Sequence, residues 1–291
     1  MLTIFALRLV IILASLLVIT PSRPDAAPIV FSVGGSDAAS IQPTVDAFRA
    51  TLGNPNNANN PGPLGSGRRE INWDGGGGVD VTTAPVTPFN VFLNTRGAQF
   101  TTPGTGLSQV PPSGGPTDGL EGLFSNPTYG VIFSTFSPLR LFAPVGSNIT
   151  DGLFFLPGSN GTVPAIVSGF GAVFTDVDLP NTTQIEFFNA ADTLLFSSFV
   201  EPGTVSDGSL SFLGVFFNAG EGLARVRITT GNTALGPNDG GGVDVVVMDD
   251  FLYSEPQQVV PEPATLLLLG TGLVGLVVWR SKRGSNNACR S

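Results

Sequence analysis

Two aspartate- and glycine-rich phrases are the first candidates for chemistry in this chain. "DGGGGVDV" covers residues 74–81 and "DGGGVDV" covers residues 239–245. Their glycines could cradle a phosphate, their aspartates could hold a metal, or each phrase could be a tight turn before a strand. A phosphate loop needs a following helix and usually a lysine. Both phrases lead into predicted strands, and residues 28–259 contain no lysine, so we reject the nucleotide interpretation.

Calcium is the metal that suits these residues, because it takes six to eight oxygen ligands from carboxylates and carbonyls. Two further aspartates, Asp176 and Asp178, have the period-two spacing that places both side chains on one face of a strand. No EF-hand spacing or calcium-binding nonapeptide repeat is present, and Asp and Gly also form ordinary turns. Turns without metal therefore remain the alternative to a structural calcium ion. The candidate ligands are Asp74, Asp80, Asp176, Asp178, Asp239, Asp244, Asp249 and Asp250.

The composition excludes several enzyme classes. Histidine is absent, and the only cysteine is Cys289 near the C-terminus. A zinc cluster, a disulfide framework and a Cys–His nucleophile are therefore excluded. A serine triad lacks both its histidine and a G-x-S-x-G elbow. Glycoside hydrolysis would need two facing carboxylates, and no pair stands out. We expect a non-enzymatic protein, with a polysaccharide-active enzyme as the alternative.

The charge distribution limits the classes of molecule that this protein can bind. Residues 28–259 contain seven Arg and twenty Asp or Glu. An acidic, lysine-free surface argues against nucleic acid and against anionic membrane surfaces. It suits a soluble extracellular protein.

Strands are the elements that must position these residues. One helix is predicted over residues 40–53, where Ile41, Val45, Phe48 and Leu52 share one face. Short strands are predicted at 69–73, 89–95 and 130–136, and glycine- and proline-rich loops at 54–67 and 102–119. A regular series of strands follows at 169–178, 183–189, 193–200, 210–217, 224–231 and 243–253.

No helical segment separates the strands of this series. They are therefore expected to pair antiparallel in a mainly β fold, a jelly-roll-like β-sandwich with one N-terminal helix. Early and late strands often lie side by side in such folds. We therefore expect the two aspartate–glycine phrases to be glycine turns that meet in space and share one cation.

The two ends of the chain carry targeting signals. Arg8 precedes the apolar stretch 9–19, and small residues follow, which is typical of a signal peptide over residues 1–27 that is cleaved near Ser22 or Ala27. At the other end "VPEP" (260–263) precedes sixteen uncharged residues, 264–279, which are predicted to form a transmembrane helix. Such a helix would be about 24 Å long, slightly short of a hydrocarbon core. The basic residues that follow stop transfer and place the tail 284–291 in the cytoplasm; they are Arg280, Lys282 and Arg283.

This order of motif, apolar span and basic run resembles the PEP-CTERM sorting signal of exopolysaccharide-producing Gram-negative bacteria. The resemblance implies recognition by a membrane-embedded cysteine protease, an exosortase, acting near Pro261, Glu262 and Pro263. Two prolines keep this segment extended and accessible to a protease. The exported protein would be held in the inner membrane before processing and then delivered to the cell surface or matrix. A plain single-pass anchor is the alternative.

The expected organisation is a signal peptide (1–27), an exported β-sandwich domain (28–259), a sorting signal (260–283) and a cytoplasmic tail. Within the domain the strand pattern is weaker over 28–128 and regular over 129–254. "VVVMDDFLYSEP" (245–256) is similar to the last strand of extracellular jelly-roll modules, some of which bind carbohydrate. "GRREINWDG" (67–75) is similar to a stretch in exported PEP-CTERM proteins of uncharacterised activity. We expect a surface or biofilm-matrix protein associated with exopolysaccharide.

Overall fold

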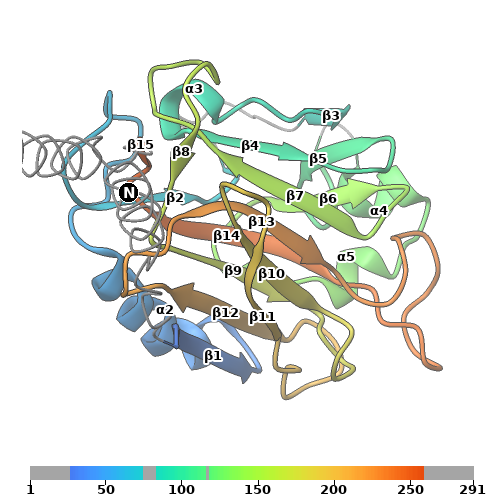
Figure 1. The fold of residues 1–291 in the computed structure, drawn as a ribbon. Coiled ribbons are helices and arrows are strands. Elements are labelled where there is room, and N and C mark those ends of the chain that lie inside the picture. The colour runs from blue at the N-terminus through green and yellow to red at the C-terminus, as the bar shows by residue number, and fades with distance from the viewer. Residues whose placement is uncertain (1–26, 75–82, 116–117, 259–291) are drawn as a thin grey trace, which may run out of the picture.

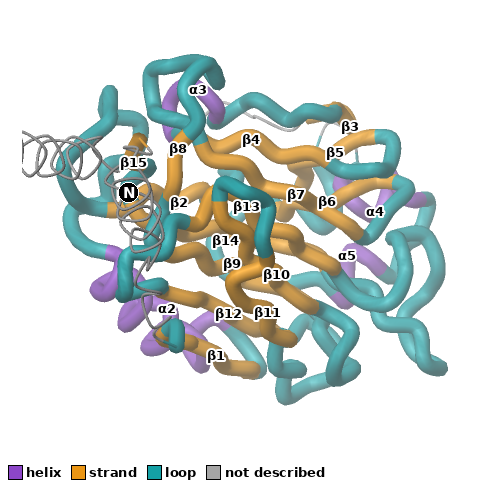
Figure 2. The backbone as a smooth tube through the Cα atoms, in the orientation of Figure 1, coloured by secondary structure: helices purple, strands orange, loops and turns teal. Residues whose placement is uncertain are grey.

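Strands dominate the computed structural model, which describes residues 27–74, 83–115 and 118–258 (Figures 1 and 2). Every pairing between named strands in these residues is antiparallel, which confirms the mainly β, antiparallel prediction. Most of the predicted signal peptide, the predicted membrane span and the predicted tail lie outside the described residues.

The larger sheet has eight strands and runs in the order β1-β12-β9-β14-β6-β5-β3, with β2 paired to one end of β14 (Figure 1). Strands that are distant in sequence are therefore neighbours, because β14 lies between β9 and β6. The bounds are β1 (Ile29–Gly35), β2 (Arg68–Ile71), β3 (Thr83–Val86), β5 (Gly106–Val110), β6 (Leu141–Val145), β9 (Gly169–Thr175), β12 (Leu210–Phe216) and β14 (Val247–Ser254).

The second sheet has five strands in the order β11-β10-β13-β7-β4, and a small third sheet pairs β15 with β8. Buried and half-exposed residues alternate along β7, as one face of a sheet requires. The bounds are β4 (Ala98–Thr101), β7 (Ile149–Phe154), β8 (Ala165–Ile166), β10 (Gln184–Asn189), β11 (Leu194–Phe199), β13 (Leu223–Thr229) and β15 (Gln257–Gln258).

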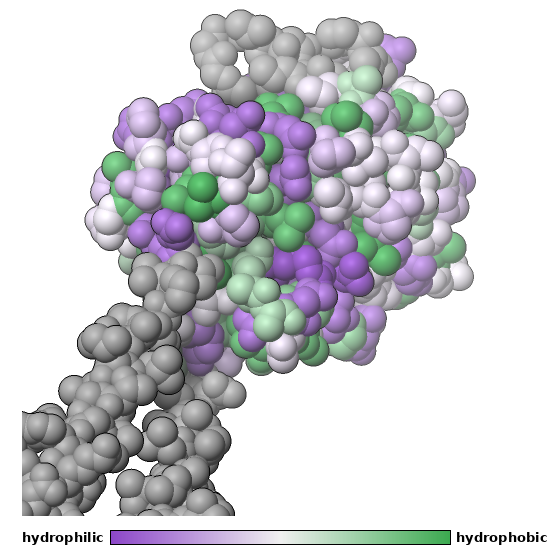
Figure 3. Space-filling model, turned by 45° about the horizontal axis from the view of Figure 1, so that its top comes forward, coloured by the Kyte–Doolittle hydropathy of each residue, from purple (hydrophilic) through white to green (hydrophobic). Residues whose placement is uncertain are grey.

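One hydrophobic core joins the two large sheets in a sandwich-like arrangement. It contains Phe170 and Phe174 from the larger sheet together with Phe187 and Val226 from the smaller one. Trp73 lies fully buried among the aromatic rings and stacks on a phenylalanine, Phe142, with ring centroids 3.9 Å apart. On the outside, Figure 3 shows hydrophobic residues scattered among hydrophilic ones on the face in view.

Helix α2 (Ala38–Leu52) confirms the predicted helix and its buried face. It begins at Ala38 rather than at residue 40 because Asp37 is its N-cap. The Asp37 carboxylate accepts a hydrogen bond from the Ser40 amide at 2.9 Å, and the Ser40 hydroxyl accepts one from the Asp37 amide at 3.2 Å, which together form a capping box. The buried side chains of α2 pack on the outer face of the larger sheet, against Phe212 and its neighbours.

The strands of the regular series, from β9 to β14, are confirmed, but two earlier predicted strands are wrong. Residues 89–95 contain helix α3 (Leu93–Arg96), and only Phe89 forms a bridge, to Phe100. Residues 130–136 contain the end of helix α5 (Tyr129–Ile132) and no strand. In α5, Tyr129, Ile132 and Phe133 enter one buried cluster at helical spacing. In both segments aromatic residues with high β propensity reach the core from a turn, so tertiary packing overrides propensity.

The predicted loop 102–119 is also wrong in part, because it contains β5. All five residues of β5 are buried, since this strand lies between β3 and β6. Helix α4 (Gly119–Phe124) begins where the predicted loop ends. The flanking glycines and prolines mark the turns around β5 rather than a continuous loop.

Candidate functional site

The described aspartates among the predicted calcium ligands fall into two groups at different places. Asp176, Asp178, Asp239 and Asp244 belong to one group, together with Asp207. Asp74, Asp249 and Asp250 belong to the other, where all three accept hydrogen bonds from residues 136–140. The prediction that the two phrases meet at one ion is therefore wrong for Asp74 and Asp239. Asp74 comes shortly after β2, which pairs with the C-terminal half of β14. Asp239 accepts a hydrogen bond from the Val245 amide, in the segment that precedes β14. Asp80 lies outside the described residues.

The second phrase forms the predicted glycine turn. Gly240, Gly241 and Gly242 have φ angles of 92°, 64° and 95°, which glycine adopts without steric cost. Gly240 and Val243 exchange two backbone hydrogen bonds of 3.0 and 3.1 Å across it. The chain then runs through residues 243–246 into β14. Of the first phrase, only Asp74 is described.

Asp176 is the most unusual residue of the first group. It follows directly after β9, and its side chain is fully buried. Neither carboxylate oxygen has a hydrogen-bond partner among the described residues. The amide of Gly208, which lies near the carboxylate, donates to the Ile132 carbonyl oxygen at 2.8 Å. Burial, followed by repulsion from the carboxylates of Asp178 and Asp239, raises the pKa of Asp176 to about 9.

Asp178 and Asp239 line the same hollow, and their carboxylates act on each other. Burial and the charge of Asp239 raise the pKa of Asp178 to about 7. Both residues line a hollow of about 430 Å³, which we call the acidic hollow. Its lining is rich in oxygen atoms, and none of the described lining residues is basic. The lining residues are Thr128, Ile132, Asp178, Ser206, Asp207, Asn238, Asp239 and Gly240.

Asp244 is fully buried and has a structural role. Its carboxylate accepts hydrogen bonds from the Asp178 amide at 3.1 Å and from the Thr182 hydroxyl. Its backbone exchanges hydrogen bonds with Asn232. Asp244 therefore ties the segment after β9 to the segment before β14, and burial raises the pKa of its carboxyl.

The second group of aspartates holds residues 136–140 against β14. The Asp249 carboxylate accepts from the Phe136 amide at 2.6 Å, and the Asp250 carboxylate accepts from the Ser137 hydroxyl at 2.6 Å. Asp74 accepts from the Leu139 and Arg140 amides. Burial raises the pKa of Asp250 to about 6 and that of Asp249 well above its ordinary value. These hydrogen bonds give the three carboxylates a structural role, and Asp249 Oδ1 is the buried oxygen among them that has no hydrogen-bond partner in the described residues.

Within the described residues, no group of three or more His, Cys, Asp or Glu side chains is arranged to hold a metal ion. Calcium binding at Asp74, Asp176, Asp178, Asp239, Asp244, Asp249 or Asp250 thus stays a prediction. Asp207, which the sequence analysis missed, comes close to this set through an exposed segment after β11. No local pattern marks it, because only the fold brings residue 207 to residues 178 and 239.

The "GRREINWDG" stretch has a structural explanation. The Arg69 guanidinium is fully buried and forms two hydrogen bonds with the Glu255 carboxylate, of 2.5 and 2.7 Å. Glu70 pairs with Arg49 of α2 at 2.9 Å. The Trp73 indole donates to the Asp249 carbonyl oxygen at 2.9 Å. The stretch therefore connects β14 to helix α2 and to the loop that precedes β2.

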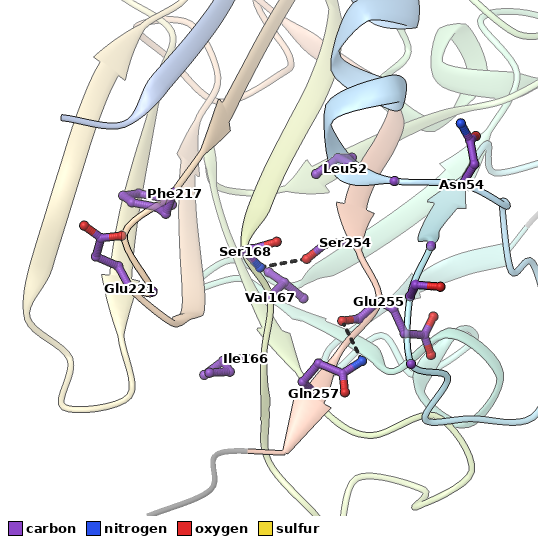
Figure 4. A pocket seen from close by; sticks show the side chains of 15 residues that line it. Leu52, Asn54, Ile166, Val167, Ser168, Phe217, Glu221, Ser254, Glu255 and Gln257 are labelled. Atoms are coloured by element: carbon purple, nitrogen blue, oxygen red, sulfur yellow. Dashed lines mark hydrogen bonds between the residues drawn. The ribbon is translucent and has the colours of Figure 1, made fainter. Parts of the chain in front are cut away.

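A second hollow, of about 390 Å³, lies beside the end of the described domain (Figure 4). Leu52, Ile166 and Phe217 provide apolar walls, and Glu255 and Gln257 line it near the point where the chain leaves the domain. Ser168 donates a 2.7 Å backbone hydrogen bond to the Ser254 hydroxyl there. Glu221 and Glu255 are the titratable side chains among its described lining residues.

Beyond the described domain, residues 259–283 match the family model of the PEP-CTERM protein-sorting motif. The match contains Pro261, Glu262 and Pro263 and the basic residues Arg280, Lys282 and Arg283. No curated protein and no solved structure matches the chain. In the part of the chain that the structure describes, no helix combines the length and apolarity needed to cross a membrane; the predicted span 264–279 lies outside that part. The chain therefore carries the sorting motif of an exported exosortase substrate.

Proposed function

We propose that this chain is a non-enzymatic surface or matrix protein, which an exosortase processes near Pro261-Glu262-Pro263 and which then associates with exopolysaccharide. The observation that carries the proposal is the sorting motif at 259–283, which begins directly after the last described residue of the β domain. In this proposal the β domain is the cargo and the C-terminal segment 264–279 is its temporary inner-membrane anchor, in a Gram-negative host.

The proposal includes a jelly-roll topology for the cargo domain. The orders β6-β14-β9-β12 and β7-β13-β10-β11 in the two large sheets support it. The successive pairs β6/β7, β9/β10, β11/β12 and β13/β14 each divide between the two sheets, as two interleaved Greek keys require. The additional strands extend the edges of this unit.

The outer face of the five-stranded sheet is the surface that we propose for polysaccharide. Asp151 accepts hydrogen bonds of 2.9 Å from both Arg225 and Arg227 on this face, and the Arg225 guanidinium lies 3.7 Å from the Phe188 ring centroid. The charged side chains of Asp151, Arg225 and Arg227 are therefore paired with one another beside an aromatic ring. Hydroxyl-rich sugars suit such a surface better than a strongly charged polymer does.

The sorting step has a direct test. Replacement of Pro261, Glu262 and Pro263 by alanine should leave a membrane-bound precursor in a host that carries the matching exosortase. The alanines remove the extended, proline-rigid backbone that the protease reads. Immunoblotting of membrane and surface fractions measures the result.

The matched control replaces Gln257 and Gln258, just before the motif, by alanine and should be processed normally. Mass spectrometry of the wild-type surface protein gives an independent measurement. A mature form that still contains residues 266–279 would show a permanent anchor and would refute the sorting step.

The alternative function, a polysaccharide-active enzyme, has one observation in its favour. Asp178, Asp207 and Asp239 line one hollow, so carboxylates do face a common space. A pull-down with purified bacterial exopolysaccharides, run beside a turnover assay on the same polymers, separates the two functions. Phe188→Ala should weaken retention and Asp46→Asn, on α2, should not. Release of shorter glycans by wild type, lost in Asp239→Asn, would establish the enzyme instead.

A further inference from the structure

We propose that the free edge of β11 binds a second copy of this chain, and that the two β11 strands pair antiparallel about a two-fold axis at Ser197. The pairing joins two five-stranded sheets into one continuous sheet. This inference is independent of the proposed sorting and polysaccharide functions, because it depends only on the backbone and side chains of one edge strand.

β11 ends the five-stranded sheet, and in the described part of the chain it pairs only with β10 (Figure 1). The Val200 amide, directly after β11, donates to the Thr183 carbonyl oxygen at 2.9 Å. Hydrogen-bonded and non-hydrogen-bonded pairs alternate along an antiparallel ladder, so the backbone groups of Ser197 and Phe199 point away from β10. β11 therefore presents N–H and C=O groups to a further strand.

The opposite end of the five-stranded sheet is closed. There Phe100 of β4 exchanges two backbone hydrogen bonds with Phe89, of 2.7 and 3.2 Å, on the side away from β7. Edge strands that stay unpaired commonly carry charged residues or proline, which oppose further pairing. The sequence of β11, LLFSSF, contains neither. A bulge leaves Leu195 without a partner in β10, but residues 196–199 keep a regular register and remain open to pairing.

The two faces of β11 match those of a second copy. Partners in an antiparallel pair lie on the same face of a sheet. Phe196 and Ser198 pair with core residues of β10 and lie on the inner face, whereas Ser197 is exposed on the outer face. Pairing of Ser197 with Ser197 of the second copy places Phe196 opposite Ser198, so inner-face residues meet inner-face residues.

The same register covers exposed apolar side chains. Leu194 and Phe199, at the two ends of β11, are 49% and 45% exposed. The two-fold axis brings the Phe199 end of each strand beside the Leu194 end of the other, which removes apolar surface from water. Residues 28–259 contain seven Arg and twenty Asp or Glu, so two copies repel over most of their surfaces. The uncharged edge of β11 is therefore suited to contact between two acidic copies.

The dimer is expected to be reversible. A contact confined to one sheet edge buries about 1,000 Å² or less, which is the size of transient interfaces. The two-fold axis is perpendicular to the joined sheet, so the outer faces of both five-stranded sheets lie on the same side of it.

The test is sedimentation velocity of the full chain in detergent, from about 1 to 100 μM, where the wild type should pass from monomer to dimer. Ser197→Pro should weaken association by about tenfold or more, because it removes an N–H that points to the free edge. The same N–H makes no bond to β10, so the variant should keep its fold. Ser197→Ala retains the N–H and should associate as wild type does.

Two further variants extend the test. Ser197→Lys retains the N–H but places two ammonium groups opposite each other at the two-fold axis, so it should also weaken association. In a Cys289→Ser background, Ser197→Cys should be joined to a second chain by a short bismaleimide. The control is Asp46→Cys, on the exposed face of α2, which should stay uncrosslinked. Circular dichroism of each variant verifies that it is folded.

Three results would overturn the inference. One is a wild type that stays monomeric over the whole concentration range, which would leave the edge to a different protein. Another is equal association of the wild type, Ser197→Pro and Ser197→Lys, which would place the contact in the C-terminal segment that all variants share. The third is crosslinking of Asp46→Cys as efficient as that of Ser197→Cys.

Discussion

At the scale of single residues, the adjacent acids Asp249 and Asp250 stand out because both are buried in the middle of β14. Their place in the strand is irregular, since the pairing of β14 with β9 shifts register between Met248 and Phe251. The shift turns both carboxylates toward residues 136–137. Burial therefore makes the protonated forms more favourable in the folded protein than in the unfolded chain.

Asp250→Asn should flatten the pH dependence of stability. Burial raises the pKa of Asp250 to about 6 from an ordinary value of 3.8. The stability that this group contributes is therefore full below its unfolded pKa and is lost as the pH rises through about 6. Relative to the variant, wild type should lose about 2 kcal/mol of unfolding free energy between pH 4 and pH 7. Urea unfolding at several pH values measures this difference.

Glu201→Gln, an exposed change, is the control and should retain the wild-type pH profile. Parallel profiles for wild type and Asp250→Asn would contradict the assigned protonation.

At the scale of elements, two glycines allow α2 to sit on the larger sheet. Gly171 of β9 and Gly214 of β12 are opposite each other in the ladder. A Cβ atom at either position would lie 2.8–2.9 Å from the Phe48 ring. The absence of side chains at these two positions therefore makes the space into which the buried face of α2 packs.

Gly171→Ala should destabilise the domain by about 1–3 kcal/mol, because the added methyl group overpacks the contact between α2 and the sheet. Its Cβ would meet Phe48, Phe212 and the Gly214 backbone, all closer than 3.0 Å. Chemical denaturation measures the loss. Gly65→Ala is the matched control, since nothing lies within 4 Å of its Cβ, and its change should stay within about 0.5 kcal/mol. Equal effects of the two substitutions would disprove the packing argument.

At the scale of the whole molecule, the buried ion pair between Arg69 and Glu255 joins β2 to the chain just after β14. Arg69 also donates to the carbonyl oxygens of Ala58, Asn60 and Thr95, and Glu255 accepts from Asn57. The residue that follows β14 is thus tied to the early loop at residues 57–60, shortly before the sorting motif begins. The ion pair therefore fixes the chain near the end of the described domain, shortly before the sorting motif at 259–283.

Arg69→Met should cost about 3–5 kcal/mol of unfolding free energy, because it leaves Glu255 buried without its partner. Arg227→Met, whose side chain is 42% exposed, should cost about 0–1 kcal/mol. The double variant Arg69→Met/Glu255→Met should recover part of the loss, since no unpaired charge remains. A loss from Arg69→Met no larger than that from the surface control would mean that the pair does not hold the domain end. Thermal and urea unfolding of all three variants give the comparison.

Local patterns were sufficient to predict the helix face of Ile41, Val45, Phe48 and Leu52 and the strand series from β9 to β14. They predicted the sorting motif as well, because a tripartite signal is read along a contiguous segment. The absence of histidine and the position of Cys289 excluded whole classes of chemistry without any structure. Each of these conclusions depends on residues close together in sequence or on composition alone.

Only the tertiary structure decided which aspartates lie together. Asp176 and Asp178 were predicted as a pair from spacing, but their meeting with Asp207 and Asp239 follows from the sheet order. The same order separates Asp74 from Asp239, although their sequence phrases are nearly identical. Non-local strand pairing makes these choices, and a local pattern of aspartates and glycines carries no information about which strands become neighbours.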